Sequence, residues 1–553
     1  MKSRFLLTCI LVIALLLRVV NLGSNPPGLH ADEISFIINS VSIMETGKDE
    51  DGQTLPLLLE SIKDSKPALY SYLQIPFFAV FGPTDFASRL PSALLGVLSV
   101  YLGYEFVRRL LKRQDLALLM AGILALSPWH ILSSRGTQEL ILSFVCVQAA
   151  LLLAMRLIPQ WVNNDKRTFS LKGLPWPSFV GLFIFSFLAM HAYHSSKILL
   201  AAFFAGVAGF SLSTPKNFPK IKKSWLLLGI IAIAFALTAS AAVTRFTMVG
   251  LFSSELPKAQ IFEYTTLSTG SAPLLLLRFL YNKVTFYGLL FLQQYLSHFS
   301  LTFLFTDGGA TLRQVIPSHG LFYLIEALLM GAGLYHFVAN QKLRALFPYW
   351  LLFLLATPIA SALTTEDVPN NVRAFSMLLP LSFLIVLGFD WILQLSQRPL
   401  RYGALALIAA GYLWGIPFFL QQYFVVMPLV DPWYRSQDYA ITAQRIAELE
   451  PEYDRVIITN DLREMYIYLW REGAISIAEI QAQPLARYEE SYQVGKYVFN
   501  RNQCDVSQAE GRTLVISTPG CGDLTDKGFE VLQETSYADG KPAMRLYKTS
   551  SEQ

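Results

Sequence analysis

Residues 5–22 read FLLTCILVIALLLRVVNL, and residues 28–33, a few positions further on, read GLHADE. The first stretch is long and apolar enough to cross the hydrocarbon core of a bilayer. The second places two adjacent carboxylates, Asp32 and Glu33, just beyond that segment. Together they predict a membrane helix that delivers two acids to a polar loop at the membrane surface.

The composition of the whole chain agrees with a membrane protein. Of its 553 residues, 53% are hydrophobic and 15% are charged, whereas a soluble domain is about one quarter charged. The mean hydropathy is +0.42. The basic start of the chain followed by an apolar run is also typical of a signal peptide, but no small-residue cleavage site follows it. We therefore expect residues 5–22 to be a retained first helix.

Many further apolar segments follow the first one, and eleven segments in all are candidate membrane spans. Two more stretches, 67–82 and 273–305, are apolar but ambiguous, and the second carries Arg278, Lys283 and His298. We expect both to lie on the membrane surface as amphipathic helices, with a membrane hairpin as the alternative. The predicted fold is an all-α multi-pass bundle with roughly 11 to 13 transmembrane helices. The eleven candidate spans are 5–22, 88–110, 115–132, 139–157, 177–193, 196–213, 225–243, 320–338, 346–363, 374–394 and 402–424.

Basic residues cluster in alternate connections between these spans, for example at Lys2 and Arg4, at 108–113 and at Lys342 and Arg344. By the positive-inside rule these connections are cytoplasmic. The expected topology in the plasma membrane therefore has a cytoplasmic amino terminus and an extracytoplasmic carboxyl terminus. Asp32 and Glu33 then lie outside.

The composition changes at about residue 431, where polar residues become frequent. The pattern predicts helices at 434–450 and 462–472, strands at 455–459, 496–499 and 513–517, and a turn at 538–541. We therefore expect a transmembrane module over 1–428, with its catalytic outer loop at 23–87, and an extracytoplasmic α/β domain over 429–553. In an oxidising exterior, Cys504 and Cys521 are expected to form a disulfide.

Adjacent acids have two interpretations. They can be a solvated loop, or they can include a base, because partial desolvation at an interface raises the proton affinity of a carboxylate. Lys66-Pro67, later in the same loop, offers a cation for a phosphate. The spacing of these residues alone does not distinguish a solvated loop from a catalytic base.

An ordered set of short motifs resembles the GT-C glycosyltransferases, in particular the group of protein O-mannosyltransferases and the lipid A aminoarabinose transferase. The resemblance extends from the amino terminus to about residue 380. The motifs in the first loop and second span are His30-Ala31-Asp32-Glu33, Gly47, Lys66-Pro67-Ala68-Leu69-Tyr70, Phe81-Gly82 and Ala87-Ser88-Arg89-Leu90-Pro91-Ser92-Ala93. The later motifs are Ser127-Pro128-Trp129-His130, Ser134-Arg135, residues 295–305, Pro317-Ser318-His319-Gly320 and Pro369-Asn370-Asn371-Val372-Arg373-Ala374.

This resemblance implies an enzyme, a hexosyl or pentosyl transferase, that moves one sugar with inversion from a polyprenyl-phosphate carrier. The acceptor would be a hydroxyl of a protein, a glycan or a glycolipid, and nucleic acid is not an expected partner. Asp32 maps onto the general base, Glu33 keeps a supporting role, and Lys66 maps onto the lysine that contacts the donor phosphate. Arg135 and Arg373 are further candidates for the phosphate, with anchoring of helix ends as the alternative.

Other residues are weaker candidates. We expect His191, His194, His319 and Tyr70 to contact donor or acceptor, although interfacial packing is the more usual role of His191 and His194. Arg89 is expected to extend to the lipid headgroups. The aminoarabinose transferases carry a glutamate just before the lysine, where this chain has Ser65. No cofactor is therefore assigned, and a divalent metal stays an open alternative without a ligand set.

Two other functions remain in competition. A transporter or lipid flippase would bury ionisable residues within its spans, often in repeated halves. The candidate spans contain few charges, which favours chemistry at the surface. A catalytically inactive relative that acts as a sensor is the second competitor, and the intact Asp32, Glu33 and Lys66 argue against it.

Overall fold

A computed structural model describes the fold in two compact units. The helical unit comprises Met1–Val20 and Ser92–Gln422, and the second unit comprises Asn21–Pro91 and Tyr423–Gln553. The two units are described separately below. The structure describes residues 2–62, 64–157, 176–212, 229–238, 250–310, 312–430, 432–461, 464–483, 489–501, 503–537 and 540–549.

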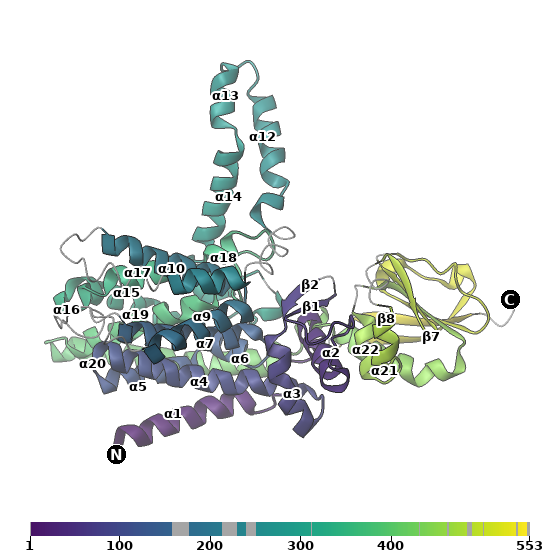
Figure 1. The fold of residues 1–553 in the computed structure, drawn as a ribbon, viewed down its shortest axis with the longest axis horizontal. Coiled ribbons are helices and arrows are strands. Elements are labelled where there is room, and N and C mark those ends of the chain that lie inside the picture. Colours follow the sequence, from purple (N-terminus) through teal and green to yellow (C-terminus); the bar gives the residue numbers. More distant parts are fainter. Residues whose placement is uncertain are drawn as a thin grey trace. The chain divides into compact units, whose positions relative to one another are not determined.

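Long apolar helices that pack in pairs form the helical unit (Figure 1). In the closest of these pairs, α15 (Leu324–Ala339) lies along α19 (Leu378–Leu393). Two glycines allow this approach, because a Cβ on Gly333 would lie 1.9 Å from the Leu384 carbonyl oxygen. A Cβ on Gly388 would lie 2.1 Å from the Leu329 carbonyl oxygen. Small residues at such crossings are typical of membrane helices.

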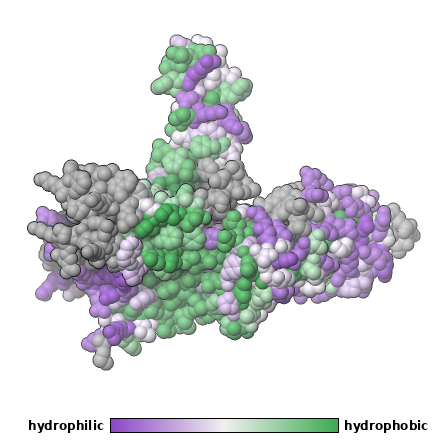
Figure 2. Space-filling view, in the orientation of Figure 1, coloured by the Kyte–Doolittle hydropathy of each residue, from purple (hydrophilic) through white to green (hydrophobic). Residues whose placement is uncertain are grey.

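Further helices of this unit, apart from the short α16, follow the predicted spans closely. Figure 2 shows that they present a broad hydrophobic surface. They are α1 (Lys2–Val19), α5 (Gln114–Leu126), α6 (Pro128–Ser134), α7 (Glu139–Leu157), α9 (Trp176–Ala192), α10 (Ser195–Leu212), α16 (Gln341–Arg344), α17 (Phe347–Ala356), α18 (Ile359–Ala362) and α20 (Arg398–Gln421), with α4 (Asp85–Leu111) shared between the units.

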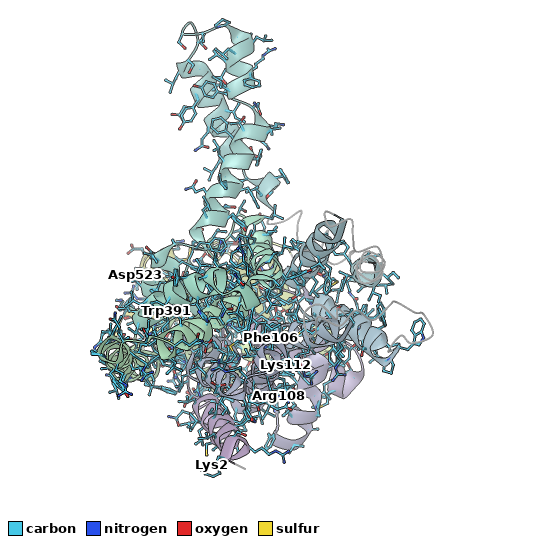
Figure 3. All side chains as sticks on the ribbon, turned by 90° about the vertical axis from the view of Figure 1, so that its left-hand side faces the viewer. Lys2, Phe106, Arg108, Lys112, Trp391 and Asp523 are labelled. Atoms are coloured by element: carbon cyan, nitrogen blue, oxygen red, sulfur yellow. A yellow bond between two sulfur atoms is a disulfide. The ribbon has the colours of Figure 1, made fainter. Side chains whose placement is uncertain are left out.

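The chain is a multi-pass membrane protein. Within the described residues, five helices are long and apolar enough to cross a membrane, or six if one bent pair counts as a span. Six shorter apolar helices accompany them. Of the predicted span at 225–243, the structure describes an apolar helix at Gly229–Thr238. The rest of this span lies outside the described residues, so the number of crossings stays a prediction. Figure 3 labels Lys2 from one basic cluster and Arg108 and Lys112 from another.

The second unit begins with the loop that carries the acids. This loop folds into α2 (Ala31–Thr46), a hairpin of β1 (Leu58–Ser61) and β2 (Asp64–Pro67), and α3 (Leu69–Phe81). The carboxyl-terminal part adds α21 (Gln437–Leu449), α22 (Met465–Arg471) and α23 (Ile477–Gln481).

A six-stranded mixed sheet completes this unit in the order β4-β5-β3-β6-β8-β7. Strand β3 is parallel to both β5 and β6, and the other pairings are antiparallel. Its strands are β3 (Arg455–Asp461), β4 (Ser491–Val494), β5 (Tyr497–Arg501), β6 (Thr513–Ser517), β7 (Phe529–Ser536) and β8 (Pro542–Thr549).

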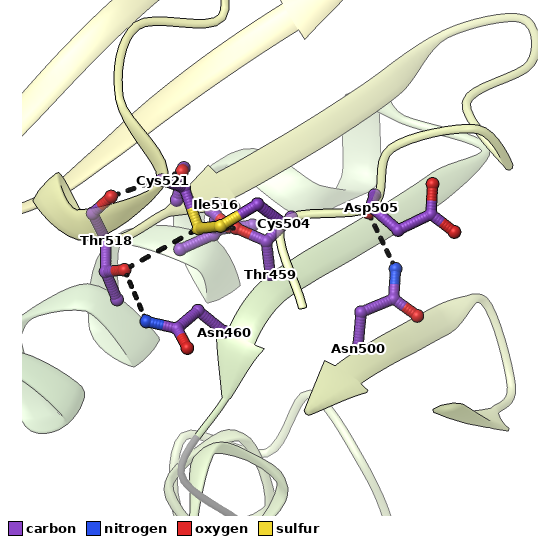
Figure 4. The surroundings of a disulfide bond; sticks show 9 residues. Thr459, Asn460, Asn500, Cys504, Asp505, Ile516, Thr518 and Cys521 are labelled. Atoms are coloured by element: carbon purple, nitrogen blue, oxygen red, sulfur yellow. Dashed lines mark hydrogen bonds between the residues drawn. A yellow bond between two sulfur atoms is a disulfide. The ribbon is translucent and has the colours of Figure 1, made fainter. Parts of the chain in front are cut away.

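One hydrophobic core joins the loop to the carboxyl-terminal part. Leu29, Ile34 and Val41 from the loop share this core with Val456 and Tyr466. The predicted boundary at residue 428 therefore separates segments that the structure packs together. A disulfide between Cys504 and Cys521 links the connections that follow β5 and β6 (Figure 4).

Candidate active site

The two acids occupy the first turn of α2, with His30 as the residue that caps the helix. The His30 imidazole accepts a hydrogen bond from the Asp32 backbone N–H at 3.2 Å. Negative charge at a helix amino terminus is favourable, because the unpaired N–H groups there carry partial positive charge. Adjacent positions on a helix point in different directions. Asp32 and Glu33 therefore meet different surroundings.

Asp32 is paired with Lys66. The Lys66 Nζ lies 2.7 Å from Asp32 Oδ1, and Lys66 is buried while 37% of the Asp32 side chain is exposed. The β1–β2 hairpin fixes this lysine, since Lys66 stands opposite Leu59 in the antiparallel register. The ammonium also lies 5.7 Å from the centre of the Phe36 ring. An ammonium carries three N–H donors, so one can face Asp32 while another turns to an anionic ligand.

Glu33 instead forms a buried, two-pronged ion pair with Arg89. Arg89 Nε lies 3.1 Å from Glu33 Oε1, and its Nη2 lies 3.2 Å from Oε2. The same guanidinium donates to the carbonyls of Leu22, Pro26 and Gly28. Arg89 is fully buried, so the expectation that it extends to the lipid headgroups is wrong. Arg89 links the loop before α2 to the start of α4. Its guanidinium is bonded to protein carbonyls and a carboxylate instead of to water.

The carboxyl-terminal part braces α2 on a different side. The Tyr468 hydroxyl donates to the Leu29 carbonyl, next to the cap of the helix. Burial raises the pKa of Tyr468 well above its usual range, helped by the charge of Glu464, so this donor stays protonated. Further along, the buried Glu50 accepts from Tyr466 at 2.7 Å and from Asn39 at 3.1 Å. Sequence reasoning missed these tyrosines, because nothing local marks a contact more than 400 residues away.

Tyr70 is part of the interior of the same unit. It is fully buried, its hydroxyl donates to the Ser88 carbonyl at 3.3 Å, and its ring packs edge-on against Phe36. It therefore supports the Phe36 ring that faces Lys66.

The two arginine candidates belong to the helical unit. Arg135 is buried, and its guanidinium donates at 2.8 Å to the carbonyls of both Leu17 and Val20. It thereby caps the end of α1, which favours the anchoring interpretation. Arg373 donates to the Thr364 hydroxyl at 2.7 Å and to the Glu366 carbonyl at 2.6 Å, and it is partly exposed in its loop.

The histidine candidates also lie in the helical unit. His319 lines a cavity of about 360 Å³ together with Ser318, Tyr323 and Trp414. Burial lowers the pKa of His319, so it is neutral, and its Nδ1 lies 2.7 Å from the Gly320 carbonyl oxygen.

His191 and His194 follow one another at the junction of α9 and α10 but make different contacts. His191 stacks on Phe187, whereas His194 Nδ1 lies 2.9 Å from the Lys197 ammonium. The charge of this ammonium would oppose a metal ion bound to the same imidazole. Within the described residues, no three His, Cys, Asp or Glu side chains gather as a metal site.

The structure thus brings Asp32, Glu33 and Lys66 together in one unit, with Arg89 as the added member. The arrangement is a carboxylate open to solvent, a buried ammonium beside it, and a second carboxylate used internally. Such a site can take a proton from a bound hydroxyl and hold a phosphate at the same place.

A family model and solved structures of similar fold relate the chain to known membrane proteins. Residues 65–243 match the family described as dolichyl-phosphate-mannose-protein mannosyltransferase. The chain shares its fold with ArnT from Cupriavidus metallidurans bound to undecaprenyl phosphate, at 12% identity and a TM-score of 0.58, over 99% of this chain and 98% of that one. The apo form of the same protein matches at 11% identity and a TM-score of 0.56, with the same coverage. These findings confirm the resemblance to GT-C glycosyltransferases of the protein O-mannosyltransferase and aminoarabinose transferase group.

A more distant likeness is to the archaeal oligosaccharyltransferase AglB from Archaeoglobus fulgidus, solved with an inhibitory peptide and a dolichol-phosphate. It is 14% identical over 84% of this chain and 63% of that one, with a TM-score of 0.48, which is too low to support an inference. No curated protein sequence matches the chain.

Proposed function

We propose that this protein is an inverting glycosyltransferase that moves one sugar from a polyprenyl-phosphate carrier to an acceptor hydroxyl at the extracytoplasmic face of the cell membrane. The pair of Asp32 and Lys66, 2.7 Å apart, carries this proposal. It places a proton acceptor near a cation, and the transfer needs the first at the attacking acceptor oxygen and the second at the departing phosphate. The match of residues 65–243 to a mannosyltransferase family and the fold shared with ArnT support it.

In the proposed reaction, Asp32 takes the proton from the acceptor hydroxyl while the acceptor oxygen attacks the anomeric carbon. The new C–O bond forms as the bond between that carbon and the phosphate oxygen breaks. The electron pair leaves with the polyprenyl phosphate, whose added negative charge Lys66 stabilises. Because phosphate is a good leaving group without protonation, one carboxylate is sufficient. Attack from the face opposite the phosphate inverts the configuration.

Glu33 acts in this proposal through position only. Its charge is used by Arg89, so it holds α2 and the loop before it in place. Arg373 remains a candidate second contact for the phosphate, and Arg135 is assigned to the end of α1. A small apolar cavity of about 70 Å³ in the helical unit, lined by Phe106, Leu151, Phe203 and Trp350 among others, is a candidate contact for part of the isoprenoid tail.

A transfer assay separates this function from that of a transporter. Purified protein in liposomes is given radiolabelled polyprenyl-phosphate sugars and cell-derived acceptors. We expect label to move to a protein, glycan or glycolipid acceptor. If labelled lipid crosses the bilayer and no sugar is transferred, the protein is a flippase.

Donor binding tests the role of Lys66. We expect Lys66→Met to raise the KM for the donor roughly 10- to 100-fold, because a hydrogen bond to a charged group contributes about 1.5–3 kcal/mol. Lys66→Arg keeps the charge and should retain most of the affinity. An unchanged KM in Lys66→Met would remove Lys66 from the phosphate site.

A further inference from the structure

Three helices of the helical unit form an arm that the proposed function does not use. They are α12 (Leu256–Leu267), α13 (Leu274–Leu280) and α14 (Lys283–Ser297). Helix α12 packs beside α14, and the chain reverses at Gly270. Figures 1 and 3 show that the arm runs across the direction of the long bundle helices and leaves their side.

Both ends of the arm join one segment of the helical unit. At its start, the Leu251 N–H donates to the Leu363 carbonyl at 2.7 Å. At its end, His298 Nε2 lies 2.8 Å from the Ser361 hydroxyl, and the Asn370 N–H donates to the same nitrogen at 3.2 Å. Since both ends lie at one level, the arm adds an even number of membrane crossings, or none.

The two sides of the arm differ in length. Leu274–Ser297 is one of the five candidate spans, but α12, which would have to make the second crossing of a hairpin, is too short for it. Helix α12 has 12 residues, and at 1.5 Å per residue it spans about 18 Å, against about 30 Å for the hydrocarbon core. The residues on either side of it, 250–255 and 268–273, are not regular α-helix. If the hairpin crossed, this irregular backbone would face lipid within the hydrocarbon region, where exposed loops do not occur.

Large apolar side chains are nevertheless exposed along the whole arm. Phe262, Leu275, Phe279 and Val284 are each at least 76% exposed. Water does not favour such a surface, and exposed apolar area on this scale marks an interaction site. The arm carries five charged residues, at its ends and along its length: Glu255, Lys258, Glu263, Arg278 and Lys283.

We infer that the arm lies in the plane of one bilayer leaflet, at the boundary between headgroups and acyl chains, and that lipid is its partner. Its apolar side chains enter the acyl region while its charged side chains reach the headgroups. Its base is bonded to the segment that also carries Arg373. The arm therefore fixes that segment at the level of the lipid phosphates. This inference does not depend on the glycosyltransferase activity.

Spin-label depth measurements test the inference in the full-length protein in phosphatidylcholine and phosphatidylglycerol liposomes. Phe262→Cys, Leu275→Cys and Phe279→Cys are made in a Cys9→Ser, Cys146→Ser background, which keeps the disulfide. These side chains are exposed, so the labels should leave the fold intact. Leu413→Cys, on an exposed face of the long helix α20, is the deep control, and the exposed Leu57→Cys in the second unit is the aqueous control.

The inference predicts that all three arm labels lie roughly 5–10 Å below the headgroups, shallower than the label at Leu413. Arm labels that are as accessible to a water-soluble relaxant as Leu57 would overturn it, because the arm would then lie in water. A label at Leu275, the labelled position nearest the turn at Gly270, that lies as deep as Leu413 or deeper would overturn it in favour of a hairpin that crosses the membrane.

Discussion

At the scale of single residues, adjacent acids have acquired opposite surroundings. Asp32 is open to solvent and meets a lysine, whereas Glu33 is buried and meets an arginine that also binds three carbonyls. A buried carboxylate that is paired in this way is closed to solvent and neutralised by an internal cation. The geometry therefore favours Asp32 as the base, and it gives Glu33 the role of holding the helix.

Replacing Glu33 tests this division of roles. We expect Glu33→Gln to lower the free energy of unfolding by about 3–5 kcal/mol, because it leaves the buried Arg89 charge unpaired. Thermal unfolding in detergent, followed by intrinsic fluorescence, measures the change. Asp32→Asn is the control, and its effect on stability should be small because Asp32 is partly exposed.

Removing both partners adds a check on the pair. Glu33→Gln combined with Arg89→Gln should cost less than the sum of the single changes, since neither charge is then left alone. Strictly additive losses would mean that the two side chains do not act as a pair.

At the scale of elements, the turn before α2 depends on close approach between distant segments. Gly28 has a φ of +71°, and a Cβ there would lie 2.6 Å from the Arg435 carbonyl oxygen. We expect Gly28→Ala to destabilise the second unit by about 1–3 kcal/mol through strain and overpacking. Gly47 has the same φ with no neighbour within 4 Å of a Cβ, so Gly47→Ala isolates the backbone cost.

The comparison is made by urea unfolding of both variants. A larger loss in Gly28→Ala than in Gly47→Ala is expected. Equal losses would show that the contact with Arg435 is not tight.

Several elements could be predicted from their local pattern, because apolar runs and runs of β-branched residues mark spans and buried strands directly. Helices α4, α7 and α9 and strands β3, β5 and β6 fall where the sequence places them. The β1–β2 hairpin could not be predicted, since Leu58–Ser61 and Asp64–Pro67 carry polar and charged residues and lack alternation. Ala538 and Asp539 of the predicted turn lie outside the described residues.

The site was predictable in part for the same reason. Asp32, Glu33 and Lys66 belong to short motifs that can be read from the chain, and the structure brings them together. Arg89 stood within such a motif, yet its position near the end of a span suggested contact with lipid. Only packing shows that a carboxylate 56 positions earlier holds it.

At the scale of the whole molecule, the open question is which side of the membrane holds the loop. We expect a membrane-impermeant thiol reagent to label Leu57→Cys on intact cells, in a background without Cys9 and Cys146, because Leu57 is 71% exposed. Lys342→Cys, in a basic connection between α15 and α17, should react only after lysis. The reverse pattern would place the acids in the cytoplasm and contradict the proposed orientation.

The grouping of residues into units lay beyond the sequence. Composition changes near residue 431, which predicted a separate carboxyl-terminal domain. The structure instead builds one core from Leu29, Ile34, Ile446 and Val456. Such a core depends on contacts between segments about 400 residues apart, and no local pattern records them.

The central claim is that Asp32 is the base of a sugar transfer, and the initial rate of Asp32→Asn tests it most directly. Purified wild type, Asp32→Asn and the control Glu45→Gln, an exposed acid on the same helix, are compared at saturating polyprenyl-phosphate sugar. The account predicts that Asp32→Asn loses at least about 100-fold in rate, the lower range for removing a general base, while Glu45→Gln is unchanged. Transfer by Asp32→Asn at the wild-type rate would contradict it.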